Sequence, residues 1–381
     1  MELCGSFYKL PVVGRSEVPG ALYGTEHCGR VPGVLRGDAV LVEDAGEGST
    51  LYNKGYFGEP RSGGGVTLSL VEAVYLVESE RLAVTEEGAP VPLRALFHRA
   101  HAKVPSFEIR YLVYRDLRQR GYVVKEAAPP LDFRVFPRGG GPKATPSKWG
   151  VLAVSERWVF DLAALAAHVR RAAGGRKNLL LAVVDEESDL TYYAVRELTP
   201  EGKAAPPHRR GAIVAHLLED RATVLDDQGA AQLYADGSYG RMIGRRLQLS
   251  LLEAAHLLKA GAIEVRRGDT NRRVTLATLL AQARRLQPDL DLRLRVYEDL
   301  RSRGIVVKTG FKYGSHFRAY EGDPDRTHAK YLVHALPADH KGMWQEVSRA
   351  VRLAHGVKKQ ILFAAVARED VSYVRLERVR P

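Results

Sequence analysis

The sequence predicts an α/β (α+β) fold built from two tandem repeats, each made of two subdomains. Three observations support this prediction: a twelve-residue segment that occurs twice, a serine-led helix start that occurs twice, and the same alternation of helices with β-branched strands in both halves. Residues 114–125 read YRDLRQRGYVVK and residues 297–308 read YEDLRSRGIVVK, so that nine of twelve positions are identical. Self-similarity at a fixed separation indicates duplicated structural units.

The similarity between the two halves extends over most of the chain. Four further pairs align at nearly the same separation: LYNKGYFG (51–58) with LYADGSYG (233–240), LSLVEAVYL (68–76) with LSLLEAAHL (249–257), FRVF (133–136) with FRAY (317–320), and KNLLLAVV (177–184) with KQILFAAV (359–366). We expect N-terminal subdomains at 1–105 and 212–290 and second subdomains at 106–200 and 291–381. Residues 201–211, with a proline pair, are predicted to form an exposed linker.

The first half of each repeat is predicted to combine short strands with a capped helix. Residues 37–44 (GDAVLVED) alternate apolar and polar side chains, as a half-buried strand does. A helix is expected to begin after Ser69 in the first repeat and after Ser250 in the second. A glutamate stands three residues later in each case, Glu72 or Glu253, which predicts a reciprocal capping box.

The second half of each repeat is predicted to form a mixed sheet flanked by helices. Amphipathic helices are expected at 109–120 and 294–303, each ended by a left-handed glycine, Gly121 or Gly304. In the second repeat we then expect a β-branched strand, a loop that holds Tyr320 and His328, and a strand at 330–336. A helix at 344–355 and strands at 360–367 and 371–377, joined by a tight turn, complete the unit.

Composition limits the class of protein. A chain of 381 residues is long enough for about two to four domains, and no apolar run approaches the ~20 residues of a membrane span. No secretion signal is evident, and Cys4 and Cys28 match no zinc spacing. We therefore expect a cytoplasmic protein, in which two unlinked thiols are favoured over a disulfide. The net charge of +12 favours a polyanionic partner such as a nucleic acid.

The two repeats differ in side chains that could carry chemistry. The aligned pairs are Tyr320 with Phe136, His328 with Pro146, and Lys359 with Lys177. The first repeat thus keeps the framework and the lysine but lacks the phenol and the imidazole. Because proton transfer requires both groups, we expect the second repeat to be active and the first inert. Drift of surface residues would produce the same pattern.

A tyrosine, a histidine and a lysine can cleave RNA without a metal, because the ribose 2′-OH supplies the nucleophile. Tyr320 would accept the 2′-OH proton if cations such as Arg318, Lys358 and Lys359 lower its pKa from ~10. His328 has an ordinary pKa near ~6.5 and suits protonation of the departing 5′-oxygen. Lys359 would stabilise charge on the phosphate, and the products would be a 2′,3′-cyclic phosphate and a 5′-OH end.

The second repeat resembles the archaeal tRNA-splicing endonucleases. The resemblance lies in RGIVVKTGFKYGSHFRAY (303–320), THAKYLVH (327–334) and RLAHGVKKQILFAAV (352–366). The layout resembles the class in which one polypeptide carries a degraded and an intact repeat and pairs with itself. The resemblance implies nuclease-like second subdomains, a homodimer, no cofactor or metal, and cleavage of precursor tRNA at bulge–helix–bulge intron junctions.

The resemblance also implies roles for single residues. It assigns catalysis to Tyr320, His328 and Lys359, and contacts with an unstacked RNA base to Arg352 and Arg375. It further implies that an acidic turn of the inactive repeat docks into a basic pocket of the partner chain. That turn would be Asp185, Glu186, Glu187 and Asp189. One position departs from the family pattern, because His316 stands where an acid is common.

Two alternatives remain open from the residues. Glu321, Asp323 and Asp325 could hold Mg²⁺ in a metal-dependent nuclease, although an acidic segment with glycine and proline is more often a solvated turn. The basic charge would also suit a non-catalytic RNA-binding or assembly subunit.

Overall fold

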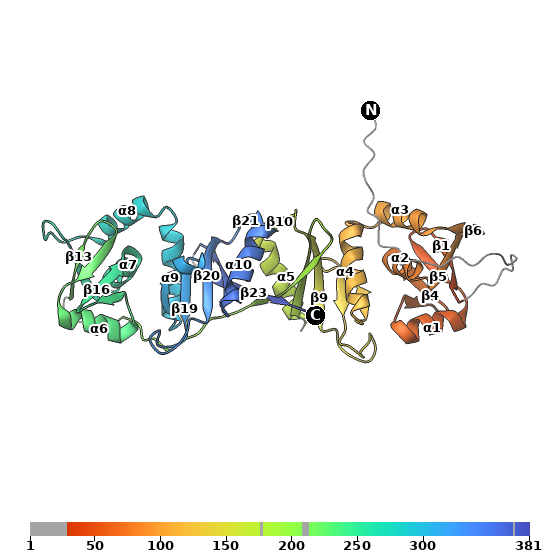
Figure 1. Ribbon diagram of the computed structural model, residues 1–381, viewed down its shortest axis with the longest axis horizontal. Helices are drawn as coiled ribbons and strands as arrows, with labels where there is room; N and C mark the ends of the chain where they lie inside the picture. Colours follow the sequence, from red (N-terminus) through yellow and green to blue (C-terminus); the bar gives the residue numbers. More distant parts are fainter. Residues whose placement is uncertain (1–28, 176–177, 208–212, 369) are drawn as a thin grey trace, which may run out of the picture.

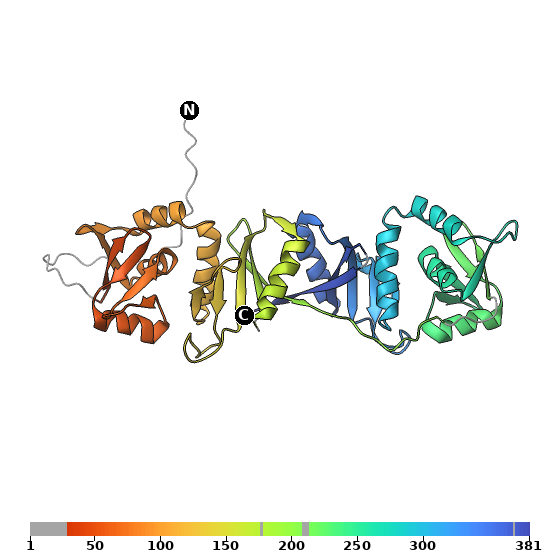
Figure 2. The same cartoon turned by 180° about the vertical axis from the view of Figure 1, so that it is seen from behind.

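The computed structural model describes residues 29–175, 178–207, 213–368 and 370–381, so that Cys4 and Cys28 lie outside the described residues. The subdomains form an elongated row, with the N-terminal subdomains at the two ends and the second subdomains together in the middle (Figure 1). The view from behind shows the same arrangement with the repeats exchanged (Figure 2), which indicates an approximate two-fold axis between them. Within the described ranges, no helix has the length and apolar character to cross a membrane.

The two N-terminal subdomains share one arrangement of strands around a capped helix. The first contains β1 (Val31–Arg36), β2 (Ala39–Val42), α1 (Ala45–Gly55), β3 (Glu59–Pro60), β4 (Val66–Ser69), α2 (Leu70–Glu78), β5 (Leu82–Glu86), β6 (Ala89–Val91) and α3 (Leu93–Lys103). The second contains β13 (Ile213–Leu217), β14 (Arg221–Val224), α6 (Asp227–Gly237), β15 (Arg241–Ile243), β16 (Arg246–Ser250), α7 (Leu251–Lys259), β17 (Ile263–Arg267) and α8 (Leu276–Leu286). Ser69 and Ser250 begin α2 and α7 with complete capping boxes, as predicted.

The second subdomains also share one order of elements. The first contains α4 (Phe107–Gln119), β7 (Val124–Glu126), β8 (Phe133–Val135), β9 (Trp149–Ser155), β10 (Val159–Asp161), α5 (Leu162–Gly174), β11 (Asn178–Val184) and β12 (Leu190–Glu197). The second contains α9 (Leu290–Ser302), β18 (Val306–Thr309), the 3-10 turn η1 (Phe311–Tyr313), β19 (Phe317–Tyr320), β20 (Tyr331–Pro337), β21 (Lys341–Met343), α10 (Trp344–Gly356), β22 (Gln360–Ala367) and β23 (Asp370–Val379). Gly121 and Gly304 follow α4 and α9 with positive φ, as predicted.

The second subdomains are fused through one mixed sheet of ten strands. Its order is β18-β19-β20-β22-β23-β12-β11-β9-β8-β7. The halves meet at β23 and β12, which pair in antiparallel fashion from Tyr192 with Val379 to Glu197 with Val374. The α/β class and the two tandem repeats predicted from the sequence are confirmed.

Apolar layers cover both faces of this sheet. On one face, α5 and α10 pack over side chains that include Leu332, Phe363 and Val374. On the other face, α9 packs over Val333 and Leu362, and α4 covers the matching part of the first repeat. Side chains alternate along a strand, so this layering determines the face on which each candidate site residue lies.

One sequence prediction about a loop differs from the structure. The sequence places Tyr320 on a loop, but it is the last residue of β19 and pairs with Val306 of β18.

The segment 201–211 is predicted to be an exposed linker. Glu201, Lys203, Ala205 and Pro206 are exposed, and backbone hydrogen bonds also attach the first residues of the segment to the second repeat. Gly202 N–H donates to the Arg303 carbonyl (2.9 Å), and Ala204 N–H donates to the Gly304 carbonyl (2.8 Å).

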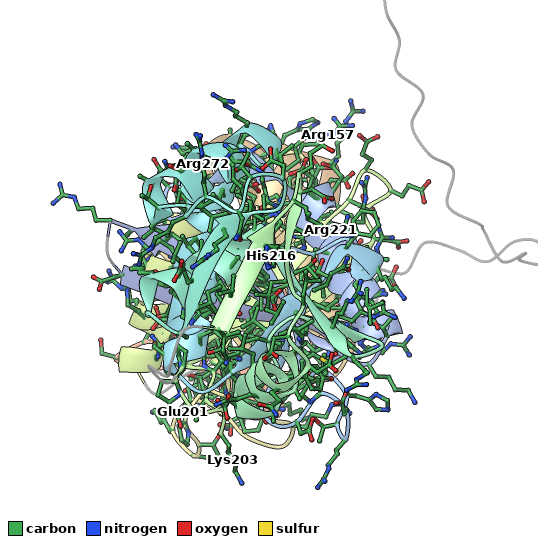
Figure 3. The ribbon with its side chains drawn as sticks, turned by 90° about the vertical axis from the view of Figure 1, so that its left-hand side faces the viewer. Arg157, Glu201, Lys203, His216, Arg221 and Arg272 are labelled. Atoms are coloured by element: carbon green, nitrogen blue, oxygen red, sulfur yellow. The ribbon has the colours of Figure 1, made fainter. Side chains whose placement is uncertain are left out.

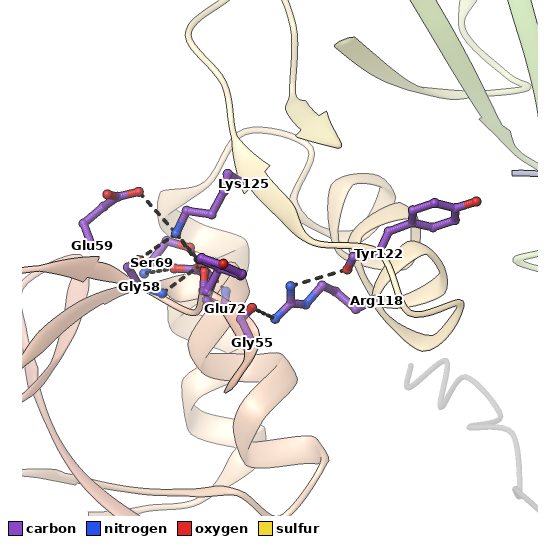
Figure 4. A network of polar contacts seen from close by, with 9 residues as sticks. Gly55, Gly58, Glu59, Ser69, Glu72, Arg118, Tyr122 and Lys125 are labelled. Carbon is purple, nitrogen blue, oxygen red and sulfur yellow. Dashed lines mark hydrogen bonds and ion pairs between the residues drawn. The ribbon is translucent and has the colours of Figure 1, made fainter. Parts of the chain in front are cut away.

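The repeated twelve-residue segment joins the two subdomains of the first repeat. Lys125 Nζ donates to the Gly58 carbonyl (2.7 Å) and pairs with Glu72 Oε1 (3.1 Å), and Arg118 Nη2 donates to the Gly55 carbonyl (2.8 Å), as Figure 4 shows. Gly55, Gly58 and Glu72 belong to the N-terminal subdomain. The segment therefore connects the subdomains, which explains its near identity between repeats without a catalytic role.

The second repeat makes the same connection with the equivalent residues. Arg301 Nη1 donates to the Gly237 carbonyl at 3.0 Å, and its guanidinium lies 4.2 Å from the centroid of the Tyr239 ring. Lys308 Nζ donates to the Gly240 carbonyl. These contacts fix the N-terminal subdomain beside β18, the first strand of the candidate site.

Replacing Lys125 with methionine should destabilise the protein by about 3–5 kcal/mol, because the buried Glu72 carboxylate loses its cation. Both side chains are almost fully buried, at 5% and 6% exposure. Urea denaturation would measure the change in the free energy of unfolding. The control Lys54→Met removes an exposed lysine of α1 and should change stability by less than ~0.5 kcal/mol. An equal effect of the two changes would contradict the role given to Lys125.

Candidate active site

Three neighbouring strands bring the candidate catalytic residues to one end of the sheet. Strand β20 runs antiparallel to β19 and parallel to β22, so the end of β19 lies beside the beginnings of β20 and β22. Lys330 joins the three strands through its backbone. Its N–H donates to the Ala319 carbonyl (3.0 Å), and its carbonyl accepts from Gln360 N–H (2.9 Å). Tyr320 follows Ala319 directly and thus lies at this end of the sheet.

His328 reaches the same end of the sheet from the loop 321–330. It lies two residues before Lys330 and one residue before Ala329, which is buried against Tyr320 and Val306. The imidazole itself is exposed, and no protein side chain or carbonyl bonds it among the described residues. Its position is therefore determined by the backbone of the loop.

Lys359 is placed by the end of α10. Its N–H donates to the Ala354 carbonyl (2.9 Å), and the preceding Lys358 adopts a left-handed conformation with φ 54°. Lys359 Nζ lies 5.3 Å from the centroid of the Tyr313 ring. The sequence analysis did not single out Tyr313, although it stands in the aromatic segment GFKYG that precedes Tyr320. The two lysines thus differ in role: Lys358 ends the helix, and Lys359 faces the aromatic turn.

Tyr320 is buried, with 6% exposure, against Val306, Ala329 and the linker residue Ala204. Burial raises the pKa of its phenol above the ordinary value, and the strongest opposing influence is the positive charge of Arg318. The Arg318 guanidinium lies 5.8 Å from the centroid of the ring. Of the cations expected to lower this pKa, Arg318 acts in that direction, but burial outweighs it and the net shift is upward.

Comparison with known proteins gives two matches in each repeat. A profile described as tRNA intron endonuclease, N-terminal domain, matches residues 31–97 and 213–280, and one described as tRNA intron endonuclease, catalytic C-terminal domain, matches 107–192 and 290–373. The tRNA-splicing endonuclease of Methanosarcina acetivorans is 40% identical, over 91% of this chain and 99% of its own length. Those of Methanococcoides burtonii and Haloferax volcanii are 39% and 33% identical, over 90% and 86% of this chain and 98% and 94% of their own lengths.

This chain belongs to the tRNA intron endonuclease family. It is an endonuclease, as its sequence predicts, and the catalytic-domain profile matches both of its second subdomains.

The two catalytic-domain units of this endonuclease share a backbone framework but not the candidate chemistry. Lys148 N–H donates to the Val135 carbonyl (2.8 Å), as Lys330 N–H does to the Ala319 carbonyl. The residue after Lys148, Trp149, pairs with Asn178, as Tyr331 pairs with Gln360. In the first repeat, Phe136 fills the position of Tyr320 and is buried. Lys177, the partner expected for Lys359, lies outside the described residues.

Arg352 and Arg375 approach the same end of β22 from opposite faces of the sheet. Arg352 is exposed on α10. Arg375 follows Val374 in β23, and neighbouring side chains of a strand point to opposite faces of the sheet. Because Val374 packs under α10, the Arg375 side chain lies on the α9 face. There its Nη1 donates to Gln360 Oε1 (3.1 Å), beside Lys359. The structure thus places both arginines near the candidate site but does not put them on one face.

The three carboxylates proposed as a metal site have protein partners. Glu321 accepts from Lys330 Nζ (2.7 Å) and from the Tyr331 hydroxyl (2.7 Å). Asp323 Oδ1 accepts from Asp325 N–H (2.9 Å), and Asp325 Oδ2 accepts from the Tyr234 hydroxyl (2.7 Å). Within the described residues, no group of three or more metal-ligating side chains gathers in one place. These contacts show that the three carboxylates shape the loop that carries them.

The acidic turn of the first repeat joins β11 to β12 and is exposed. Asp185 Oδ1 accepts from Glu187 N–H (3.0 Å) and Asp189 N–H (2.9 Å), so this carboxylate shapes the turn. Glu186 pairs with Arg157 at 2.8 Å. Lys203 marks the position of the candidate site, because its N–H donates to the Glu321 carbonyl at the base of the loop 321–330. Figure 3, a view along the molecule, shows Arg157 on the side away from Lys203.

His316 lies at the other end of β19 from Tyr320. Its N–H donates to the Val333 carbonyl (3.1 Å), and its Nδ1 accepts from Ala335 N–H (2.9 Å). It therefore ties β19 to β20 away from the candidate site. Its ring contacts His334, with centroids 5.5 Å apart, and His334 stacks on Phe363.

We expect the pair of histidines to make the protein less stable in acid. Burial, together with His316, lowers the pKa of His334 to about 4. The unfolded chain would bind this proton near pH ~6.5, so stability is full above ~6.5 and falls as the pH drops toward about 4, by on the order of 3 kcal/mol. Urea denaturation at several pH values would measure the fall.

His334→Phe keeps an aromatic ring for stacking but cannot be protonated, so it should remove this part of the pH dependence. His98→Phe, at an exposed position of α3, is the matched control and should leave it unchanged. Identical pH profiles for His334→Phe and the unaltered protein would show that His334 does not contribute.

Proposed function

We propose that this chain is a tRNA-splicing endonuclease that cuts precursor tRNA at bulge–helix–bulge intron junctions without a metal. The observation that carries the proposal is the meeting of Tyr320, His328 and Lys359 at one end of the sheet in the second repeat, while the first repeat keeps the same backbone without the phenol and imidazole. Relatives that span the same length are named tRNA-splicing endonucleases.

The reaction follows from the three side chains. The ribose 2′-oxygen attacks the adjacent phosphorus and gives its proton to Tyr320 as the P–O bond to the 5′-oxygen breaks. His328 gives a proton to that leaving oxygen, so the products are a 2′,3′-cyclic phosphate and a 5′-OH end. Lys359 stabilises the negative charge that develops on the non-bridging oxygens. No water or electron carrier is consumed.

The high pKa of the proposed base, Tyr320, limits the rate of this reaction. Because burial raises the pKa of Tyr320, the phenol is protonated in the free chain at neutral pH. Only the ionised fraction can accept the 2′-OH proton, and this fraction grows about tenfold per pH unit below the pKa. Because the imidazole acid of this mechanism must keep its proton, the cleavage rate should rise with pH below the ordinary imidazole pKa of ~6.5 and level off above it, where loss of the acid offsets the gain in ionised phenol.

The proposal is tested with purified protein, EDTA and an end-labelled bulge–helix–bulge RNA. Cleavage that leaves 2′,3′-cyclic phosphate and 5′-OH ends is the expected result. Cleavage only after Mg²⁺ is added would favour the alternative of a metal-dependent nuclease. Tight binding without any cleavage would favour a non-catalytic RNA-binding subunit.

In the same assay, His328→Ala, Lys359→Ala and Tyr320→Phe should each slow single-turnover cleavage by ~10²–10³-fold with little change in RNA binding. Tyr320→Phe should also lose the rise of rate with pH. The matched control is His316→Ala, which should cleave at close to the original rate because His316 lies at the far end of β19. A Tyr320→Phe protein that cleaves at the original rate would show that another group is the base.

The active form in this proposal is a homodimer. One chain has one complete set of candidate residues, whereas removal of an intron requires two cuts, and a two-fold dimer supplies two sites at a fixed distance. The exposed acids of the 185–189 turn supply charge for the contact. These acids lie beside Arg157, on the side of the molecule away from Lys203 and thus away from the candidate site of their own chain. This position supports docking onto a second chain.

Reversing Glu186, Glu187 and Asp189 to lysine should convert the dimer to monomers and abolish cleavage, with Asp185 retained because it shapes the turn. Light scattering coupled to size exclusion measures the mass. The control reverses three exposed acids elsewhere, Glu43, Glu87 and Glu219, for the same change of charge. A dimeric, active protein after reversal of the turn would rule out this contact.

A further inference from the structure

We propose that Tyr234, in the N-terminal subdomain of the second repeat, positions the loop that carries His328 by a hydrogen bond to Asp325, and so sets the rate of cleavage without contacting RNA at the scissile bond. The Tyr234 hydroxyl donates to Asp325 Oδ2 at 2.7 Å. Figure 1 shows this loop at the lower edge of the molecule, next to α6. The inference rests on the proposed role of His328 as the acid.

The loop is compact but has little support of its own beyond its base. Asp323 organises the turn: its carbonyl accepts from Thr327 N–H (2.9 Å) and Thr327 Oγ1 (2.7 Å). Glu321 and Lys330 close the base through a 2.7 Å ion pair. In the part of the chain that the structure describes, the bond from Tyr234 is the one polar contact of residues 322–329 with another element. Its loss would leave the turn held at the base alone.

Tyr234 is itself well anchored. It lies on α6, packs against the core of the second repeat, and has Lys308 Nζ 5.8 Å from its ring centroid. Arg301 holds the end of the same helix through the Gly237 carbonyl. The hydrogen bond to Asp325 is the largest of the effects that raise the pKa of Tyr234 to about 12, so the hydroxyl keeps its proton throughout the neutral range. The subdomain connection described above thus extends to the loop.

The first repeat supports the same arrangement independently. Tyr52 occupies the position of Tyr234, and Lys143 occupies the position of Asp325, both at a separation of 182 residues (234 − 52 and 325 − 143). Lys143 Nζ lies 5.9 Å from the centroid of the Tyr52 ring. A tyrosine of each N-terminal subdomain therefore meets the loop of its own repeat. In the repeat with the imidazole, however, the contact is a directed hydrogen bond to a carboxylate.

Positioning matters here because the His328 side chain is exposed and has no bonded partner among the described residues. The loop backbone alone sets the distance between the imidazole and the leaving oxygen. General acids act only within hydrogen-bonding reach, and displacement by about 1 Å can cost ~10² in rate. A hydrogen bond from the N-terminal subdomain to Asp325 therefore affects the position of the imidazole and, through it, the rate of cleavage.

The test is Tyr234→Phe, which removes the hydroxyl and keeps the ring. We expect single-turnover cleavage of saturating bulge–helix–bulge RNA to slow by about 10–100-fold, with the dissociation constant for RNA unchanged within about twofold. Tyr52→Phe is the matched control in the first repeat and should cleave normally. Asp325→Ala should match Tyr234→Phe, and Asp325→Asn, which keeps an acceptor oxygen, should lie between it and the original protein.

Two further measurements make the outcome decisive. The double variant Tyr234→Phe, Asp325→Ala should be no slower than either single variant, since both remove one bond. Amide hydrogen exchange of residues 321–330 in the free protein should increase in Tyr234→Phe and not in Tyr52→Phe. Hydrogen exchange can be measured whether or not the protein cleaves RNA, so it tests the Tyr234–Asp325 hydrogen bond by itself. Failure of the proposed function would show separately, as an unaltered protein that does not cleave. Unchanged exchange or an unchanged rate in Tyr234→Phe would overturn the inference.

Discussion

The candidate site depends on the backbone of Lys330, which is bonded to strands on both sides. Its N–H binds β19 and its carbonyl binds β22, so residues separated by long stretches of sequence meet at one end of the sheet. Each such bond contributes only about 0.5–1.5 kcal/mol, but together they leave the strands one register. Lys148 makes the equivalent bond to β8 in the first repeat. The framework therefore forms whether or not the phenol and imidazole are present, and the first repeat folds without them.

The burial of Tyr320 shows how positioning and chemistry oppose one another in this site. Val306, Ala329 and Ala204 enclose the ring and fix its direction, yet the same burial raises the pKa of the group that acts as the base in the proposed mechanism. The charge of Arg318 partly offsets this effect. Ala204 belongs to the segment between the repeats, so the connection that joins the two units also forms one wall around the tyrosine.

Local patterns in the sequence were sufficient to predict most helices and strands. The capping boxes at Ser69 and Ser250 and the glycines after α4 and α9 are local signals, and the structure confirms them. Strand β19 was missed because four residues are too few for a clear alternation. The fused ten-stranded sheet could not be predicted, since the pairing of β12 with β23 leaves no local pattern. The face of Arg375 and the bond from Tyr234 to Asp325 likewise depend on strand register and subdomain docking, which spacing in the sequence does not reveal.

The first repeat contributes to the candidate site of the second. Strand β10 pairs with β21 directly before α10, and Leu162 N–H donates to the His340 carbonyl (3.1 Å). Along α10, the Tyr193 hydroxyl bonds Ser348 Oγ (3.0 Å). The first repeat thus holds α10, which presents Arg352 and leads into Lys359. A sheet that ended at β23 would leave this strand as an exposed edge, paired only with β22, and would uncover one side of α10. The first repeat is therefore a structural part of the unit that carries the candidate site.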